Sequence, residues 1–199
     1  MLFFQKLMQN FKFRNIFLIY LSFLYLAAIY YLYLKHTGGL DSTISEWLIN
    51  YFGGFTRRGL AGEIFANISI NLDIEVRFVI FIFQSLFYLI FLILIYFYFK
   101  NLKNYFLFYV CLFCPLFLIY HVAELEILAR KEILVFINFL FFLFLAEQNN
   151  LRKFIPIYLF ITIPFILLIW EPIVFFLPFY VLILIHILNE KKFLIFFLK

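Results

Sequence analysis

Two long stretches without a charged residue constrain the fold of this chain more than any other feature. They cover residues 16–34 and 78–99 and consist mainly of Phe, Ile, Leu and Tyr. A helix of about 20 apolar residues crosses the roughly 30 Å of hydrocarbon in a bilayer. It also satisfies its own backbone hydrogen bonds, which lipid cannot do. Each stretch therefore predicts a membrane-spanning helix.

The composition agrees with a membrane location for the whole chain. Of its 199 residues, 67% are hydrophobic and 14% are charged, which excludes an ordinary soluble domain. We expect an all-α, polytopic integral membrane protein that forms a single membrane domain over residues 1–199, with about six transmembrane or re-entrant helices. Besides the two long stretches, the apolar segments are residues 105–120, 133–146, 154–170 and 173–188.

The distribution of charge predicts the orientation of these helices. Basic residues gather before the first span and at residues 100–103, 152–153 and 191–192, whereas most acidic residues fall in the other connections. The positive-inside rule then places the N-terminus in the cytoplasm, and we expect the bacterial inner membrane. No small-residue cleavage site follows the first basic segment, so the first span should be retained. A new apolar run stops at Lys199, so we expect either the N-terminal fragment of a longer protein or an interfacial end.

The longest connection, residues 35–77, is predicted to form an ordered outer loop. Thr43 and Glu46 have the spacing of a helix capping box, and Gly53 offers a stop for that helix. Trp47 should lie among the interfacial aromatic residues of a short surface helix. A second amphipathic helix is predicted to follow. Its apolar face would consist of Leu60, Ile64, Phe65, Ile68 and Leu72, with Glu63 on the polar face.

Two adjacent arginines, Arg57 and Arg58, lie between these predicted helices and are framed by glycines. Guanidinium groups bind phosphate oxygens in a bidentate manner, and free backbone amides near a helix start favour anions. The pair therefore suggests a phosphate site. The alternative is that both arginines contact lipid headgroups or neighbouring acidic residues.

A second polar segment, residues 121–132, precedes an apolar run that is too short to cross a bilayer. Residues 133–146 would form a helix of only about 21 Å. We expect this helix to extend backward to residue 127, which would place Arg130, Lys131 and Glu132 at outer-leaflet depth beside an aqueous cavity. A tilted helix or a thinned bilayer, with Lys131 snorkelling, is the alternative.

Residues 154–188 would be too long for one crossing, about 52 Å as a single helix. Glu171 and Pro172 predict a hairpin turn in this stretch. The Glu171 side chain would then lie either in the outer cavity or simply in the turn.

The order of a first span, a long loop with paired arginines and many short spans resembles polytopic envelope glycosyltransferases of the GT-C fold and O-antigen polymerase-like membrane proteins. In GT-C enzymes the first outer loop carries the catalytic acid, and the donors are lipid-phosphate-linked sugars. The resemblance implies Asp41 as that acid, with Glu46 as its substitute. The paired acidic motif of many GT-C enzymes is not present here. The polymerases hold pyrophosphate-linked glycans with outer-face arginines. The resemblance implies that Arg57 and Arg58 would have this role here.

The first functional hypothesis is envelope glycan or glycolipid biosynthesis, by sugar transfer from a polyprenyl-phosphate donor at the outer membrane face. Asp41 or Glu46 would act as the general base. The phosphate or substrate would be bound by Arg57, Arg58, Glu63, Arg130, Lys131 and Glu171.

Two other functions stay open: a transporter or flippase for an anionic solute or lipid, and a non-catalytic membrane subunit. We expect no metal site, no cofactor and no nucleic acid. The expected partners are membrane lipid and a polyprenyl-phosphate-linked sugar. Neither catalysis nor the oligomeric state follows from the residues alone.

Overall fold

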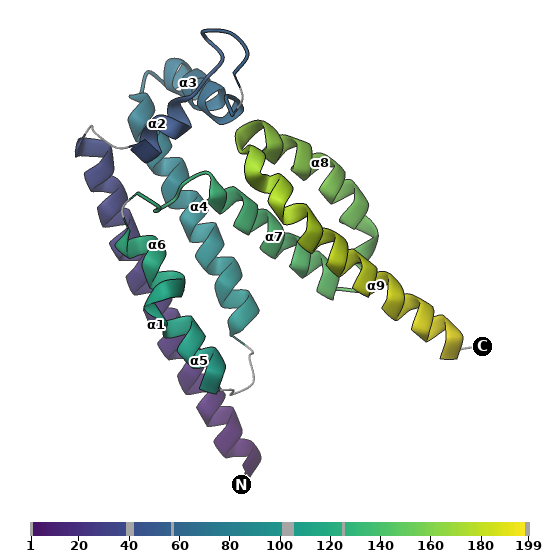
Figure 1. The fold of residues 1–199 in the computed structure, drawn as a ribbon. Coiled ribbons are helices and arrows are strands. Elements are labelled where there is room, and N and C mark those ends of the chain that lie inside the picture. Colours follow the sequence, from purple (N-terminus) through teal and green to yellow (C-terminus); the bar gives the residue numbers. More distant parts are fainter. Residues whose placement is uncertain (1, 39–41, 57, 101–105, 125, 198–199) are drawn as a thin grey trace.

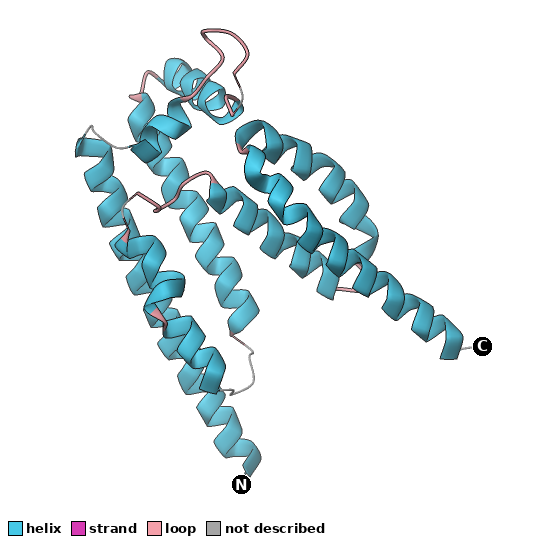
Figure 2. Ribbon diagram, viewed as in Figure 1, coloured by secondary structure: helices cyan, strands magenta, loops and turns pink. Residues whose placement is uncertain are grey.

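Helices dominate the computed structural model, which describes residues 2–38, 42–56, 58–100, 106–124 and 126–197. These described residues contain helices and turns but no strand, as Figure 2 shows. The all-α prediction is therefore confirmed. In order, the elements are α1 (Leu2–Gly38), α2 (Ser42–Leu48), α3 (Leu60–Leu72), α4 (Val76–Phe99), α5 (Phe106–Phe113), η1 (Pro115–Ile119), α6 (Tyr120–Ala123), α7 (Glu132–Glu147), η2 (Arg152–Phe154), α8 (Ile155–Ile169), η3 (Glu171–Phe176) and α9 (Leu177–Phe197).

Figure 1 shows α2 and α3 together at one end of the molecule, which we call the loop end. Helices α1 and α8 and the α5–α6 segment lead toward the loop end, whereas α4, α7 and α9 lead away from it. Among the residues that the structure describes, three helical segments are long and apolar enough to cross a membrane: Arg14–Gly38, Val76–Phe99 and Arg152–Ile169. Shorter apolar helices include Val110–Ala123 and Glu171–Ile187. The structure thus supports a membrane protein with several spans.

The largest apolar cluster lies between α1 and α4, with contributions from the α5–α7 region. Phe17, Leu24 and Ala28 of α1 are buried in it with Tyr88 and Leu92 of α4. In a membrane such helix pairs associate by close van der Waals packing, because lipid tails are as apolar as the side chains. The loop end lies at one end of this pair of helices (Figure 1).

A second apolar cluster holds the loop end onto α4 and α8. It contains Ile44 and Trp47 of α2, Phe65 of α3, Ile80 of α4 and Ile169 of α8. The predicted interfacial position of Trp47 is therefore wrong. Its side chain is fully buried and packs against Phe65 and Phe87, with ring centroids 5.7 and 6.0 Å away. The apolar face of α2 meets protein, not lipid, because α3 and α4 cover it.

Helix α3 forms where the second amphipathic helix was predicted, and it ends where Asp73 adopts a left-handed conformation (φ 52°). Its position against α2 depends on Gly62. A Cβ atom added there would lie 2.0 Å from the carbonyl oxygen of Ile49 and 2.9 Å from that of Trp47. Only glycine permits this approach of the two backbones.

Helix α7 begins at Glu132, so its predicted extension back to residue 127 is wrong. The physical reason is Ala129, whose φ of 52° cannot continue a right-handed helix. The sixteen residues of α7 span about 24 Å. The predicted hairpin is confirmed, since α8 ends at Ile169 and the short helix η3 leads into α9.

A buried polar cluster joins α7, α8 and α9. The Asn138 side-chain amide donates to the Tyr180 hydroxyl at 3.0 Å. The Tyr158 hydroxyl donates to the Asn138 backbone carbonyl at 3.0 Å and contacts the Asn138 side-chain oxygen. Hydrogen bonds of this kind connect helices inside membranes, where apolar contacts alone specify little.

Candidate functional site

Charged side chains from four separate segments meet at the loop end. Glu46 comes from α2, Arg58 from the loop before α3, Arg130 and Lys131 from the turn before α7, and Glu171 from the start of η3. All five were predicted site residues, and the structure brings them together. We call them the loop-end cluster.

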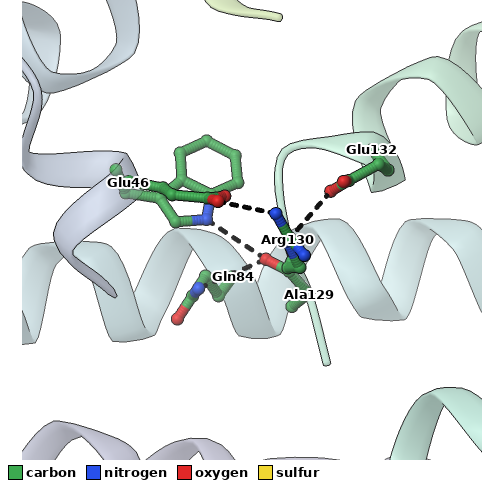
Figure 3. Close-up of polar contacts among 6 residues, drawn as sticks. Glu46, Gln84, Ala129, Arg130 and Glu132 are labelled. Atoms are coloured by element: carbon green, nitrogen blue, oxygen red, sulfur yellow. Dashed lines mark hydrogen bonds and ion pairs between the residues drawn. The ribbon is translucent and has the colours of Figure 1, made fainter. Parts of the chain in front are cut away.

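The backbone of Ala129 is the fixed point of this cluster. Its carbonyl oxygen accepts hydrogen bonds from the Trp47 indole nitrogen and the Gln84 side-chain amide, each at 3.2 Å. Gln84 is buried on α4, and Figure 3 shows its amide directed at that oxygen. Two donors from different helices therefore hold the turn that carries Arg130 and Lys131.

Arg130 lies between two carboxylates, as Figure 3 shows. Its Nη2 atom is 2.6 Å from Glu46 Oε1, and its Nε atom is 3.6 Å from Glu132 Oε2. The first contact has the length of a strong charge-assisted hydrogen bond, and the second is a looser ion pair. The positive charge of Arg130 is thus offset by protein groups, and an incoming phosphate would compete with Glu46 for it.

Lys131 faces the loop and not open solvent. Its side chain is 1% exposed, its Nζ atom donates to the Arg58 backbone carbonyl at 2.8 Å, and it lies 5.9 Å from the centre of the Trp47 ring. Burial lowers the pKa of Lys131 to about 8; the Glu46 carboxylate opposes this shift and the Arg58 cation adds to it. The ammonium group therefore fixes the backbone of another site residue.

Arg58 opens onto a cavity beside Glu171. Its guanidinium Nη2 atom is 4.0 Å from Glu171 Oε2, and its side chain is 43% exposed. The cavity has a volume of about 260 Å³, and we call it the Arg58 pocket. It is lined by Tyr51, Phe55, Thr56, Arg58, Leu167, Leu168 and Glu171.

The aromatic wall of the Arg58 pocket is ordered by local contacts. The Tyr51 and Phe55 rings are stacked, with centroids 5.5 Å apart and planes 10° from parallel. The Thr56 hydroxyl donates to the Asn50 carbonyl at 3.0 Å and closes the loop behind them. A Cβ atom at Gly59 would lie 2.4 Å from the Tyr51 ring, so glycine lets that ring approach.

Glu63 stabilises the loop that contains Tyr51. One of its carboxylate oxygens accepts a hydrogen bond from the Tyr51 backbone amide at 3.1 Å, and the other lies 3.5 Å from the Asn67 amide nitrogen. Its role in substrate binding stays a prediction. Asp41 and Arg57, the other predicted site residues, lie outside the described residues.

A second cavity of about 250 Å³ borders Arg130. Besides Arg130 and Glu132, its lining includes the rings of Tyr88, His121 and Phe136. The sequence predicted an aqueous cavity near Arg130, although it did not identify these aromatic walls. It also gave no role to Gln84, whose only signal is that it is a polar residue in an apolar stretch.

Within the described parts of the chain, no group of three His, Cys, Asp or Glu side chains is placed to hold a metal ion. No protein-family model matches the chain, and neither a curated protein nor a solved structure matches it significantly. We therefore infer function from the geometry of the loop end.

Proposed function

We propose that this protein acts in envelope glycan or glycolipid biosynthesis and transfers a sugar from a polyprenyl-phosphate donor at its loop end. The observation that carries this proposal is the composition of the Arg58 pocket. One cavity combines an accessible guanidinium group, two stacked aromatic rings and two leucines of α8. A donor of this class contains three matching parts: a phosphate, a sugar and an isoprenoid chain.

Each wall of the pocket suits one part of such a donor. The Arg58 guanidinium can donate two parallel hydrogen bonds to phosphate oxygens, which a lysine ammonium group cannot do in the same planar geometry. Aromatic rings such as those of Tyr51 and Phe55 provide flat surfaces for the C–H face of a sugar. Leu167 and Leu168 are half exposed on α8, where an apolar chain can lie against them.

The proposed reaction needs a base and stabilisation of the leaving group. An acceptor hydroxyl oxygen attacks the anomeric carbon, the bond from that carbon to the phosphate oxygen breaks, and the phosphate leaves with the electron pair. Arg58 neutralises that charge. A carboxylate accepts the hydroxyl proton, and the candidates are Asp41 and Glu46. For Glu46 to serve, its contact with Arg130 must loosen when substrate binds.

The proposal includes a topology in which the loop end faces outward, the N-terminus is cytoplasmic and six segments cross a bacterial inner membrane. The alternating direction of α1, α4, α5–α6, α7, α8 and α9 in Figure 1 supports it. The basic side chains of Lys100 and Lys153, far from the loop end, also support it under the positive-inside rule.

The test is to compare surface glycans and lipid-linked precursors in source cells that carry the wild-type gene, no gene, or an Arg58→Ala gene. We expect a truncated glycan and precursor accumulation on the outer leaflet without the gene and with Arg58→Ala. Lys153→Ala, which removes an exposed cation at the opposite end of α8, is the matched control and should behave as wild type. Precursor accumulation on the inner leaflet would show that the protein translocates the precursor and does not transfer the sugar. An unchanged profile would refute both functions.

A further inference from the structure

The contact between Lys131 and Arg58 joins two segments far apart in the sequence. The donor is a buried ammonium group and the acceptor is a backbone carbonyl in the loop that forms the Arg58 pocket. Because the acceptor is backbone, this contact fixes where residue 58 lies without occupying its guanidinium group. The side chain of Arg58 stays free to face Glu171 and the pocket.

The backbone at Arg58 needs such support. Its φ is 67°, a left-handed conformation that a residue with a Cβ atom adopts at a cost. Ala129, two residues before Lys131, also has a positive φ, and its carbonyl is held by Trp47 and Gln84. Two strained backbone positions are therefore joined through one lysine side chain. Strain of this kind persists where surrounding contacts over-determine the conformation.

We propose that Lys131 is a positioning residue for the Arg58 pocket: it holds the Arg58 backbone so that the guanidinium faces Glu171 and the cavity in which the phosphate would bind. Lys131 itself does not contact the ligand. The positioning part of this proposal, that Lys131 holds the Arg58 backbone, depends only on contacts within the chain. The phosphate part, that Arg58 then binds a phosphate, rests on the proposed function. The sequence suggested instead that Lys131 binds the phosphate or substrate directly, so the two roles make different predictions.

A distance measurement on the full chain tests the positioning part alone. Spin labels would be placed at Phe52→Cys in the loop and Phe175→Cys in η3, because both phenylalanines are exposed and neither lines the pocket. Cys111 and Cys114 are free thiols and would be changed to Ser. We expect one narrow distance distribution in the otherwise wild-type chain and a broadened or shifted one in Lys131→Met, which fills similar space without a donor.

Two further variants make the comparison specific. Lys131→Arg keeps a positive charge and N–H donors, so it should restore the narrow distribution. Lys153→Met makes the same chemical change at an exposed position far from the loop end and should leave the distribution unchanged. If Lys131→Met does not fold, Lys131→Gln replaces it, because the polar but shorter side chain cannot reach the Arg58 carbonyl. An unchanged distribution in the folded Met or Gln variant would overturn the proposal.

Binding of a short-chain polyprenyl monophosphate in detergent then separates the two parts. We expect Lys131→Met to weaken binding about tenfold, the size of one charge-assisted hydrogen bond, and Lys131→Arg to recover it. If the wild-type chain does not bind this probe while Lys131→Met still broadens the distances, the proposed function fails and the positioning role stands. If Lys131→Met weakens binding and the distances stay unchanged, Lys131 is a ligand contact and the proposal fails.

Discussion

The α1–α4 pair and the loop end are held together in different ways. Between α1 and α4 the buried side chains are almost all apolar, and many atoms share the packing. At the loop end a few polar atoms decide the arrangement, among them the Ala129 carbonyl, the Arg130 guanidinium and the Lys131 ammonium. Apolar packing tolerates small adjustments, whereas a polar contact needs one particular partner. The loop end should therefore be the region where single substitutions have specific effects.

The largest expected effect is at Gly62, where α2 and α3 touch through their backbones. Gly62→Ala places a Cβ atom 2.0 Å from the Ile49 carbonyl oxygen, so the helices must separate. We expect a loss of about 3 kcal/mol or more in the free energy of unfolding, measured by chemical denaturation in detergent. Gly53→Ala is the control, because nothing lies within 4 Å of its added Cβ atom. Equal stability of the two variants would contradict the close approach of α2 and α3.

The stability of the α1–α4 pair should fall when a buried side chain is truncated, but not when an exposed side chain is truncated. Leu24→Ala removes a buried side chain from the α1–α4 cluster and should destabilise the protein by about 2 kcal/mol. Phe23→Ala, on the neighbouring exposed position, should change stability by less than about 0.5 kcal/mol. The measurement is the same denaturation experiment. A larger effect at Phe23 would mean that the packed face of α1 is assigned incorrectly.

The two carboxylates beside Arg130 should differ in strength. Glu46→Gln removes the charge from the 2.6 Å contact and should cost about 1 kcal/mol. Glu132→Gln affects only the 3.6 Å pair and should cost less than about 0.5 kcal/mol, since this contact is too long for a hydrogen bond and is a partly exposed ion pair. A double-mutant cycle with Arg130→Met measures each coupling energy directly. Equal couplings would show that Arg130 does not prefer Glu46.

A separate prediction is a pH dependence that comes from Lys131. Its pKa is about 8 when folded and about 10.5 when unfolded, so between these values the unfolded chain binds more protons. The free energy of unfolding of the wild type, relative to Lys131→Met, should therefore rise as pH increases from 8 to 10.5. The slope is at most about 1.4 kcal/mol per pH unit. Parallel stability curves for the two proteins would contradict the lowered pKa.

The sequence predicted those elements whose signals are local. The helix at residues 60–72 follows from its apolar periodicity, and the α8–α9 hairpin follows from Glu171 and Pro172. The predicted extension of α7 to residue 127 is wrong because no residue pattern reveals the left-handed backbone of Ala129. The burial of Trp47 could not be predicted, because the sequence of an amphipathic helix does not show whether protein or lipid covers its apolar face.

Part of the candidate site was also predictable from residue types. Arginines and acidic residues stand out in a chain with little charge, and Glu46, Arg58, Arg130, Lys131 and Glu171 do meet in the structure. Their partners could not be predicted, since Glu46 and Arg130 are 84 positions apart. The role of Gln84 depends on its hydrogen bond to the Ala129 backbone carbonyl. The sequence does not show which backbone carbonyl a side chain will meet.

The most direct test of the central claim is the binding of a short-chain polyprenyl monophosphate to the purified full chain, compared with the matching polyprenol, which lacks the phosphate. We expect the wild type to bind the monophosphate, to bind the polyprenol at least about tenfold more weakly, and to lose that preference in Arg58→Ala. Equal affinity for the two lipids, or an unchanged preference in Arg58→Ala, would contradict the assignment of the Arg58 pocket as a phosphate site.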